Sequence, residues 1–208
     1  MKFALIKKEE ASFWRSCQSI TSNLVAAYEV FCRENSHNFE VLSFARGGDV
    51  LESYDLARQV LQGRFAYVVW LDHYPHPESF IKGLVSQSSE ENLTPMVVHL
   101  FGDFILQAPQ WKNAIDSLKN LGREGQLPLK LICASEKQRE LVYCLLNNQE
   151  GVEVCPFPVE NDPFSFRVET REHNRTKLGF SQEDKVFLYT GRLSHQKNII
   201  DLIYAFSA

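Results

Sequence analysis

Tyr67-Val68-Val69-Trp70-Leu71 is a short apolar run, and Met96-Val97-Val98-His99-Leu100 is a second one further along the chain. Between them, Glu78 to Val85 carries apolar side chains at helical spacing. Short apolar runs rich in β-branched and aromatic residues are typical of buried strands. Two such strands joined by a helix form a right-handed crossover between parallel strands. The stretch from Tyr67 to Leu100 therefore predicts a βαβ unit of a parallel sheet that is covered on both faces.

The same alternation continues on both sides of this stretch. Further strands are predicted over residues 3–6, 39–44, 129–133 and 152–155, and further helices over 20–31, 50–61, 111–121 and 136–146. Six strands alternating with helices indicate the α/β class and a Rossmann-like parallel sheet with helices on both faces. Ligands of such sheets bind beyond the carboxyl ends of the strands. The candidate binding loops are therefore those after Ile6, Phe44, Leu71, Leu100, Cys133 and Cys155.

A second unit follows a segment rich in proline. Residues 156–164 contain three prolines and show no helical period, so we expect them to run extended over the surface. Beyond them, Val186 to Thr190 predicts a strand, Gly191 a tight turn and Ile199 to Phe206 an amphipathic helix. The predicted organisation is a Rossmann-like domain over 1–155, a linker over 156–180, and the first strand and helix of an incomplete second domain over 181–208.

The turn at Gly191 has the chemistry of an anion site. Glycine lets a ligand approach the backbone, and the helix that follows presents unpaired N–H groups and the positive end of its dipole. Arg192 and Lys197 add two cations at this entrance, and a guanidinium can contact phosphate oxygens with two N–H groups at once. Spacing alone fits a diphosphate site and an ordinary α/β turn with two solvated cations equally well.

The whole segment resembles the start of the C-terminal domain in GT-B glycosyltransferases of the GT4-like superfamily. The matching residues are Gly191, Arg192, Leu193, Ser194, Lys197 and Asn198. In that family the arginine and the lysine contact the diphosphate of a nucleotide-sugar donor. The resemblance thus implies Arg192 and Lys197 as catalytic residues, and Gly191, Arg192 and Lys197 as donor-binding residues.

The resemblance extends into the first domain. Residues 132–139 are similar to a strand-to-helix segment of the family, and 154–161 match its hinge loosely, with Pro158 in place of the hinge glycine. The family implies a retaining enzyme that needs no metal or other cofactor and uses a nucleotide sugar as donor substrate. Its acceptor, whether carbohydrate, lipid or protein, is not identified by the sequence, and neither is the donor nucleotide or sugar.

His99 is the third catalytic candidate. It ends a predicted buried strand, with Asp103 close behind it, so it is placed to contact a sugar hydroxyl or to move a proton. A hydrogen-bonded core histidine is the alternative. The matching loop of many GT4-like enzymes holds a histidine that faces the cleft, which favours the functional interpretation. The loop Asp72 to Pro77 fits acceptor binding and a proline-braced turn equally well, and its two histidines lack further ligands for a metal site.

Composition excludes several classes of protein. The formal net charge of −4 argues against general nucleic-acid binding, which needs a basic face. Five cysteines without ligand spacing predict buried reduced thiols and a cytoplasmic protein. No apolar stretch is long enough for a signal peptide or a membrane span, while a peripheral membrane association stays open.

One departure from the family supports a different function. The first loop, taken as Lys7 to Ser19 with Ser19 as a helix N-cap, lacks the glycine pair that GT4-like domains place there. The alternative is a shortened, non-catalytic relative that dimerises through its C-terminal unit or docks on a partner. The apolar stripe for this contact would be Ile199, Ile200, Leu202, Ile203 and Phe206. Under the enzyme hypothesis we expect the chain to be incomplete and, alone, weak or inactive.

Overall fold

The computed structural model describes residues 1–9, 15–45, 50–71, 77–88, 93–101, 116–120, 127–146, 150–159, 167–191, 193 and 197–207. The chain divides into two compact units, Met1–Glu160 and Asn161–Ala208. The first unit holds the parallel sheet and is the part that carries the predicted α/β pattern.

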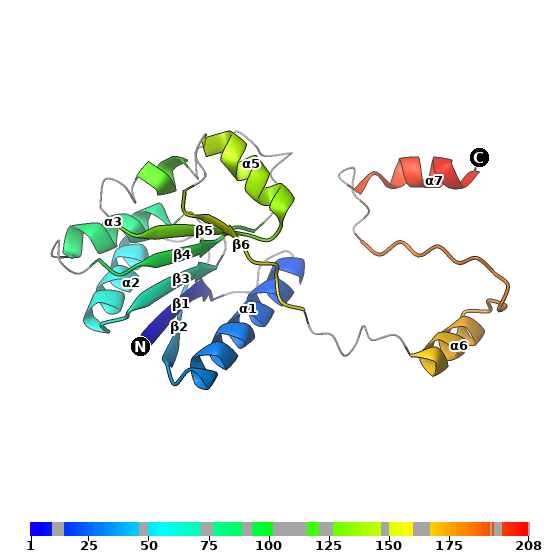
Figure 1. Cartoon of the computed structure of the whole chain (residues 1–208), viewed down its shortest axis with the longest axis horizontal. Coiled ribbons are helices and arrows are strands. Elements are labelled where there is room, and N and C mark those ends of the chain that lie inside the picture. The colour runs from blue at the N-terminus through cyan, green and yellow to red at the C-terminus, as the bar shows by residue number, and fades with distance from the viewer. Residues whose placement is uncertain are drawn as a thin grey trace. The chain divides into compact units, whose positions relative to one another are not determined.

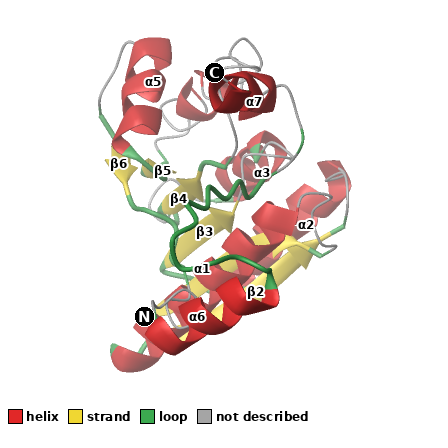
Figure 2. Cartoon of the chain, turned by 90° about the vertical axis from the view of Figure 1, so that its right-hand side faces the viewer, coloured by secondary structure: helices red, strands yellow, loops and turns green. Residues whose placement is uncertain are grey.

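The sheet has six strands in the order β2-β1-β3-β4-β5-β6, and each neighbouring pair is parallel. Figure 1 shows this arrangement, and Figure 2 shows the strands side by side in yellow. The strand bounds are β1 Lys2–Lys8, β2 Asn38–Phe44, β3 Tyr67–Leu71, β4 Met96–His99, β5 Leu129–Cys133 and β6 Val152–Val154. The predicted fold class, a Rossmann-like parallel sheet, is confirmed.

Helices connect these strands as the βαβ pattern requires. Their bounds are α1 Arg15–Glu34, α2 Val50–Gln62, α3 Glu78–Gln87 and α5 Glu136–Leu146, and residues 116–120 are also helical. The rest of the predicted helix 111–121 lies outside the described residues. Ser19 is inside α1, so its prediction as a helix N-cap is wrong, because the helix begins before it at Arg15.

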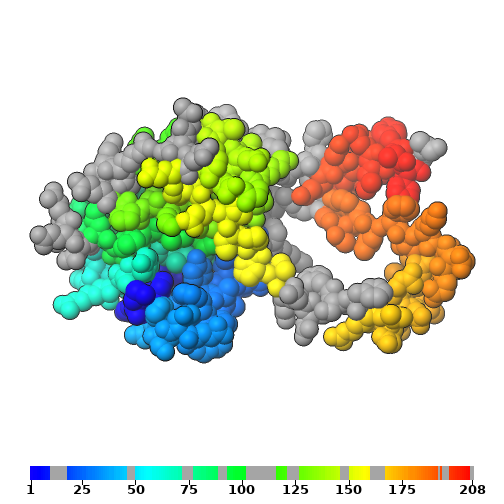
Figure 3. Space-filling view, in the orientation of Figure 1, coloured from blue at the N-terminus to red at the C-terminus, as the bar shows by residue number. Residues whose placement is uncertain are grey.

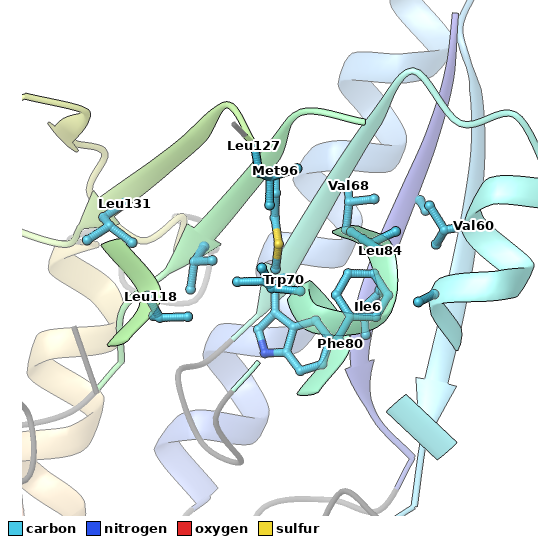
Figure 4. Packing of buried hydrophobic residues seen from close by; sticks show 14 of the residues in the cluster. Ile6, Val60, Val68, Trp70, Phe80, Leu84, Met96, Leu118, Leu127 and Leu131 are labelled. Carbon is cyan, nitrogen blue, oxygen red and sulfur yellow. The ribbon is translucent and has the colours of Figure 1, made fainter. Parts of the chain in front are cut away.

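Side chains alternate between two apolar clusters because successive residues of a strand point to opposite faces of the sheet. Ile6, Val68 and Trp70 join the larger cluster with residues of α2 and α3. Figure 4 shows Trp70 beside Phe80 in this layer. On the other face, a smaller cluster forms under α1 from Leu5, Leu24, Val69, Leu71 and Phe101. Both faces of the sheet are therefore covered, which explains why its strands are apolar on both sides.

The second unit contains two helices, α6 Val168–Lys177 and α7 Ile199–Ser207. Helix α6 lies inside the segment predicted as a linker. The predicted strand over Val186 to Thr190 is wrong: these residues are described, and they form no strand. A strand needs a hydrogen-bonded neighbour, and in the described part of the chain every paired strand belongs to the sheet of the first unit.

Free thiols are found at Cys32, Cys133, Cys144 and Cys155. Cys32 and Cys133 are buried, as the sequence predicts, whereas Cys144 and Cys155 are exposed. Burial raises the pKa of the Cys133 thiol to about 11, so this group is protonated and unreactive at neutral pH.

Candidate functional site

The sheet order places a topological switch point between β1 and β3. Strand β2 lies to one side of β1, and β3 to β6 continue on the other side, so ligands are expected beyond the carboxyl ends of β1 and β3. The loop residues 10–14 and 72–76 follow these strands and lie outside the described residues. So do the other candidate loop residues Arg46 to Gly48 and Asp103. Among the described residues, the sequence candidate His99 ends the neighbouring strand, β4.

His99 is almost completely buried, at 2% exposure, on the face of the sheet that α1 covers. Its Nε2 atom lies 2.8 Å from the hydroxyl oxygen of Tyr28 in α1, and the two rings meet edge to face. Burial lowers the pKa of His99 from 6.5 to about 4. The imidazole is therefore neutral at pH 7. Among the described residues none forms a hydrogen bond with its other nitrogen, Nδ1.

Tyr28 is the hydrogen-bond partner of His99 that the sequence did not reveal. The pKa of Tyr28 is raised to about 12, mainly by burial and to a smaller extent by the thiols of Cys155 and Cys32. The available signal was weak: Tyr28 follows Leu24 by four residues on the apolar face of the predicted helix, where an aromatic residue usually serves packing alone. The hydroxyl turns this packing position into a polar contact at the end of β4.

A buried glutamine ties together the loops after β4 and β5. The Nε2 group of Gln138 donates to the carbonyl oxygen of Leu100 at 3.2 Å, and its Oε1 accepts the backbone N–H of Ala134. The backbone N–H of Gln138 donates to Oγ of Ser135, which caps the start of α5. This bridge holds Leu100, and with it the end of β4, against the next strand. Ser135 and Gln138, three residues apart, form the capping pattern that signals the start of this helix in the sequence.

The segment after β6 packs over the α1 face of the sheet. The ring of Phe157 meets that of Phe101 edge to face at 5.1 Å, and the Asn23 side chain donates to the carbonyl oxygen of Pro158 at 2.9 Å. In Figure 3 this segment, in yellow, lies against α1, in blue. Phe157 also packs against the smaller apolar cluster. Residues 156–159 therefore cover the same face that holds Tyr28 and His99.

In the second unit, Gly191 and Lys197 both precede α7 in the chain. Lys197 is exposed and directly precedes Asn198, whose side-chain amide donates to a carboxylate oxygen of Asp201 at 2.6 Å. A Cβ atom added at Gly191 would meet the phenol group of Tyr189, with 2.6 Å to its oxygen. Arg192 and Ser194 lie outside the described residues. Gly191 and Lys197 belong to the second unit, whereas His99 belongs to the first.

The described residues hold no group of three His, Cys, Asp or Glu side chains placed to bind a metal ion. None of the helices described is both long enough and apolar enough to cross a membrane.

No family model and no curated protein matches the chain. A similar solved structure is Alr3699/HepE of Anabaena in complex with UDP and glucose, at 14% identity and a TM-score of 0.48 over 86% of this chain and 50% of that one. Another is a possible leucine/isoleucine/valine-binding protein of Rhodopirellula baltica SH 1, at 9% identity and a TM-score of 0.28 over 89% of this chain and 76% of that one. The chain spans about half the length of the Anabaena protein. Likenesses this distant carry no argument about activity, and the fold class rests on the sheet order itself.

Proposed function

We propose that the chain is part of a GT-B glycosyltransferase of the GT4-like superfamily, which transfers a sugar with retention from a nucleotide-sugar donor to an acceptor. Residues 1–155 form the acceptor-side domain, and residues 181–208 form the start of the donor-side domain. The parallel sheet agrees with the first assignment. The resemblance of Gly191 to Asn198 to the family's donor motif supports the second.

The observation that carries the proposal is the position of Lys197 at the entrance of α7. Lys197 is exposed and lies two residues before the first residue of a helix whose first N–H groups and dipole favour an anion. Asp201 brings a negative charge into the same turn, but Asn198 donates a hydrogen bond to its carboxylate. Arg192 and Lys197 then neutralise the charge that develops on the leaving diphosphate. Every 1.4 kcal/mol of such selective stabilisation gives about tenfold in rate.

His99 has a narrower role in this proposal than the sequence suggested. With a pKa of about 4, its imidazole carries almost no proton to give at pH 7. A neutral ring is suited to a hydrogen bond with an uncharged oxygen, such as a sugar hydroxyl. We therefore assign His99 to sugar contact rather than to proton transfer.

Calorimetric titration with inorganic pyrophosphate tests the anion site. We expect Lys197→Gln to weaken binding about tenfold, since it removes one cation from the diphosphate. The matched control is Lys185→Gln, which removes the same charge from another exposed lysine of this unit. Equal weakening by the two changes would show general charge attraction and no site at α7.

Sugar transfer itself requires a form of the protein with a complete donor-side domain. In that form Arg192→Ala should abolish transfer from a panel of nucleotide sugars and leave the fold intact, as monitored by circular dichroism. Normal transfer by this variant would remove Arg192 from the mechanism. The 208 residues alone should bind a nucleotide sugar only weakly, so tight binding in calorimetry would also contradict the proposal.

A second candidate function, a non-catalytic interaction module, is favoured by one observation. Ile200, Leu202, Ile203 and Phe206 of α7 are all exposed, between 44% and 64%. Apolar side chains gathered on one short helix usually seek an interface. Light scattering distinguishes the two functions: an interaction module that dimerises through α7 becomes a monomer on Ile203→Glu, whereas the anion site predicts unchanged mass and unchanged pyrophosphate binding.

A further inference from the structure

The contact between Tyr28 and His99 has a preferred direction. A phenol O–H is a stronger donor than a neutral imidazole N–H, and an imidazole nitrogen is a stronger acceptor than a phenol oxygen. At 2.8 Å the hydroxyl of Tyr28 therefore donates, and Nε2 of His99 accepts. The neutral ring carries one proton, and Nε2 is occupied as an acceptor. The proton must then reside on Nδ1.

The surroundings of the pair keep both groups uncharged. The smaller apolar cluster, with Leu24, Leu71 and Phe101 and with Phe157 packed on it, lies on the same face of the sheet, and Tyr28 packs against it. Among the described residues, the titratable groups that act on Tyr28 are the thiols of Cys155 and Cys32, and no carboxylate is among them. A protonated imidazole would have no described counter-ion here. The neutral tautomer with its proton on Nδ1 is the form that this site selects.

This tautomer leaves a donor without a partner. No described residue forms a hydrogen bond with Nδ1, although the ring is 2% exposed. Buried N–H groups are rarely left unpaired in proteins, because each one costs free energy comparable to a lost hydrogen bond. The carboxyl end of a parallel strand next to the switch point is also where ligands of such sheets bind. An oxygen of a bound molecule would satisfy this donor.

We propose that Tyr28 is a positioning residue: its hydroxyl donates to Nε2 of His99 and so fixes the proton on Nδ1, which then donates to an uncharged oxygen of the sugar. This inference rests on the proposed function and names the part of the substrate that the first unit contacts. The neutral imidazole serves a hydroxyl or ring oxygen of a sugar. Tyr28 itself touches no substrate.

Histidine nitrogen NMR on the whole chain tests the tautomer without any substrate. In the wild-type protein, selectively labelled His99, identified by its loss in His99→Gln, should show a protonated Nδ1 and an unprotonated Nε2. Tyr28→Phe removes only the hydroxyl, and we expect a mixture of the two tautomers. The matched control is Tyr143→Phe, which removes another partly buried hydroxyl, one that donates to the carbonyl oxygen of Val152 at 3.4 Å. That change should leave the signals of His99 unaltered.

Two results would overturn the inference. One is a wild-type His99 with its proton on Nε2, a measurement that stays decisive even if Tyr28→Phe does not fold. The other is an unchanged tautomer in a folded Tyr28→Phe protein, which would make the hydroxyl irrelevant to the ring. Neither result depends on pyrophosphate binding, so the proposed function can fail or survive separately.

Steady-state kinetics then distinguishes a positioning role of Tyr28 from a contribution to stability alone. In a form that transfers sugar, Tyr28→Phe should lower kcat/KM about tenfold, the scale of one misdirected hydrogen bond, and leave pyrophosphate affinity unchanged. Tyr143→Phe should change neither quantity. A loss of kcat/KM of the same size in both variants would assign the effect to stability, and no loss in Tyr28→Phe would remove its role in positioning.

Discussion

At the scale of single residues, His99 links burial to the pH dependence of stability. Its pKa is about 4 in the folded protein and 6.5 in the unfolded chain, because burial disfavours the charged ring. The unfolded state therefore binds more protons between these two values, and stability falls as the pH decreases through this range. Above pH 6.5 the full stability is present. At pH 4 the loss due to this one residue reaches about 3 kcal/mol, with about 1.4 kcal/mol per pKa unit.

Urea unfolding at pH 7 and at pH 5 measures this effect. We expect His99→Gln, which cannot be protonated, to lose less stability than the wild type between the two values. The comparison uses the change in the free energy of unfolding between the two pH values. Any pH-independent destabilisation by the substitution therefore cancels. A variant that loses as much stability as the wild type would show that His99 is not the buried titrating group.

At the scale of elements, glycine ends helix α6. Gly179 has a φ of +77°, its N–H bonds the carbonyl oxygen of Thr176, and the next N–H, of Phe180, bonds that of Arg175. This pair of bonds is the Schellman arrangement, which needs a left-handed residue after the helix. The guanidinium of Arg175 then donates to the carbonyl oxygens of Ser181 and Asp184 beyond the turn. The helix and its following turn are therefore one local structure.

Gly179→Ala tests this end of the helix without creating a clash. No atom lies within 4 Å of the added Cβ, so the cost comes from the left-handed backbone alone and should be about 1 kcal/mol. Amide hydrogen exchange at Gly179 and Phe180 should become about fivefold faster, since that energy corresponds to this factor. Gly191→Ala is the control, because its Cβ meets only the phenol group of the Tyr189 side chain. Equal acceleration of these amides by both variants would contradict the backbone argument.

The elements differ in how far the sequence predicts them. β3, β5 and α5 begin and end as predicted, because each has a clear apolar period and polar or turn-forming neighbours. Helix α6 was missed because it buries no residue in the described structure and so shows no apolar stripe. The strand expected at Val186 has the right composition, but strand formation also depends on a partner.

The residues of the candidate site also differ in how far the sequence predicts them. The sequence predicts the position of His99 at the end of an apolar strand and that of Lys197 before an apolar helix. The contact of Tyr28 with His99 could not be assigned from the sequence, because it spans 71 residues of chain. The sequence signals Gln138 as part of a helix cap, but not its contact with Leu100 across 38 residues. Spacing indicates where a side chain emerges from an element, whereas packing decides which group it meets.

At the scale of the whole molecule, the first compact unit continues to Glu160, past the predicted domain end at 155. The additional residues are held by two unlike contacts, the rings of Phe157 and Phe101 and the hydrogen bond from Asn23 to Pro158. Proline restricts the backbone of the same segment, so holding it there costs less entropy than holding a glycine hinge would. Residues 156–159 therefore belong to the first unit and not to the linker.

Two fragments of the chain test this boundary. We expect residues 1–160 to unfold cooperatively, and residues 1–155 to be less stable by about 2 kcal/mol, the scale of one partly buried aromatic side chain and one hydrogen bond. Phe157→Ala within 1–160 should reproduce most of that loss, and Val159→Ala, at a position 66% exposed, should reproduce little of it. Urea unfolding followed by tryptophan fluorescence measures all four proteins, since Trp70 is buried in the sheet. Equal stability of 1–155 and 1–160 would mean that the two contacts of this segment do not stabilise the sheet, and the end of the folded domain would then be Cys155, as the sequence predicts.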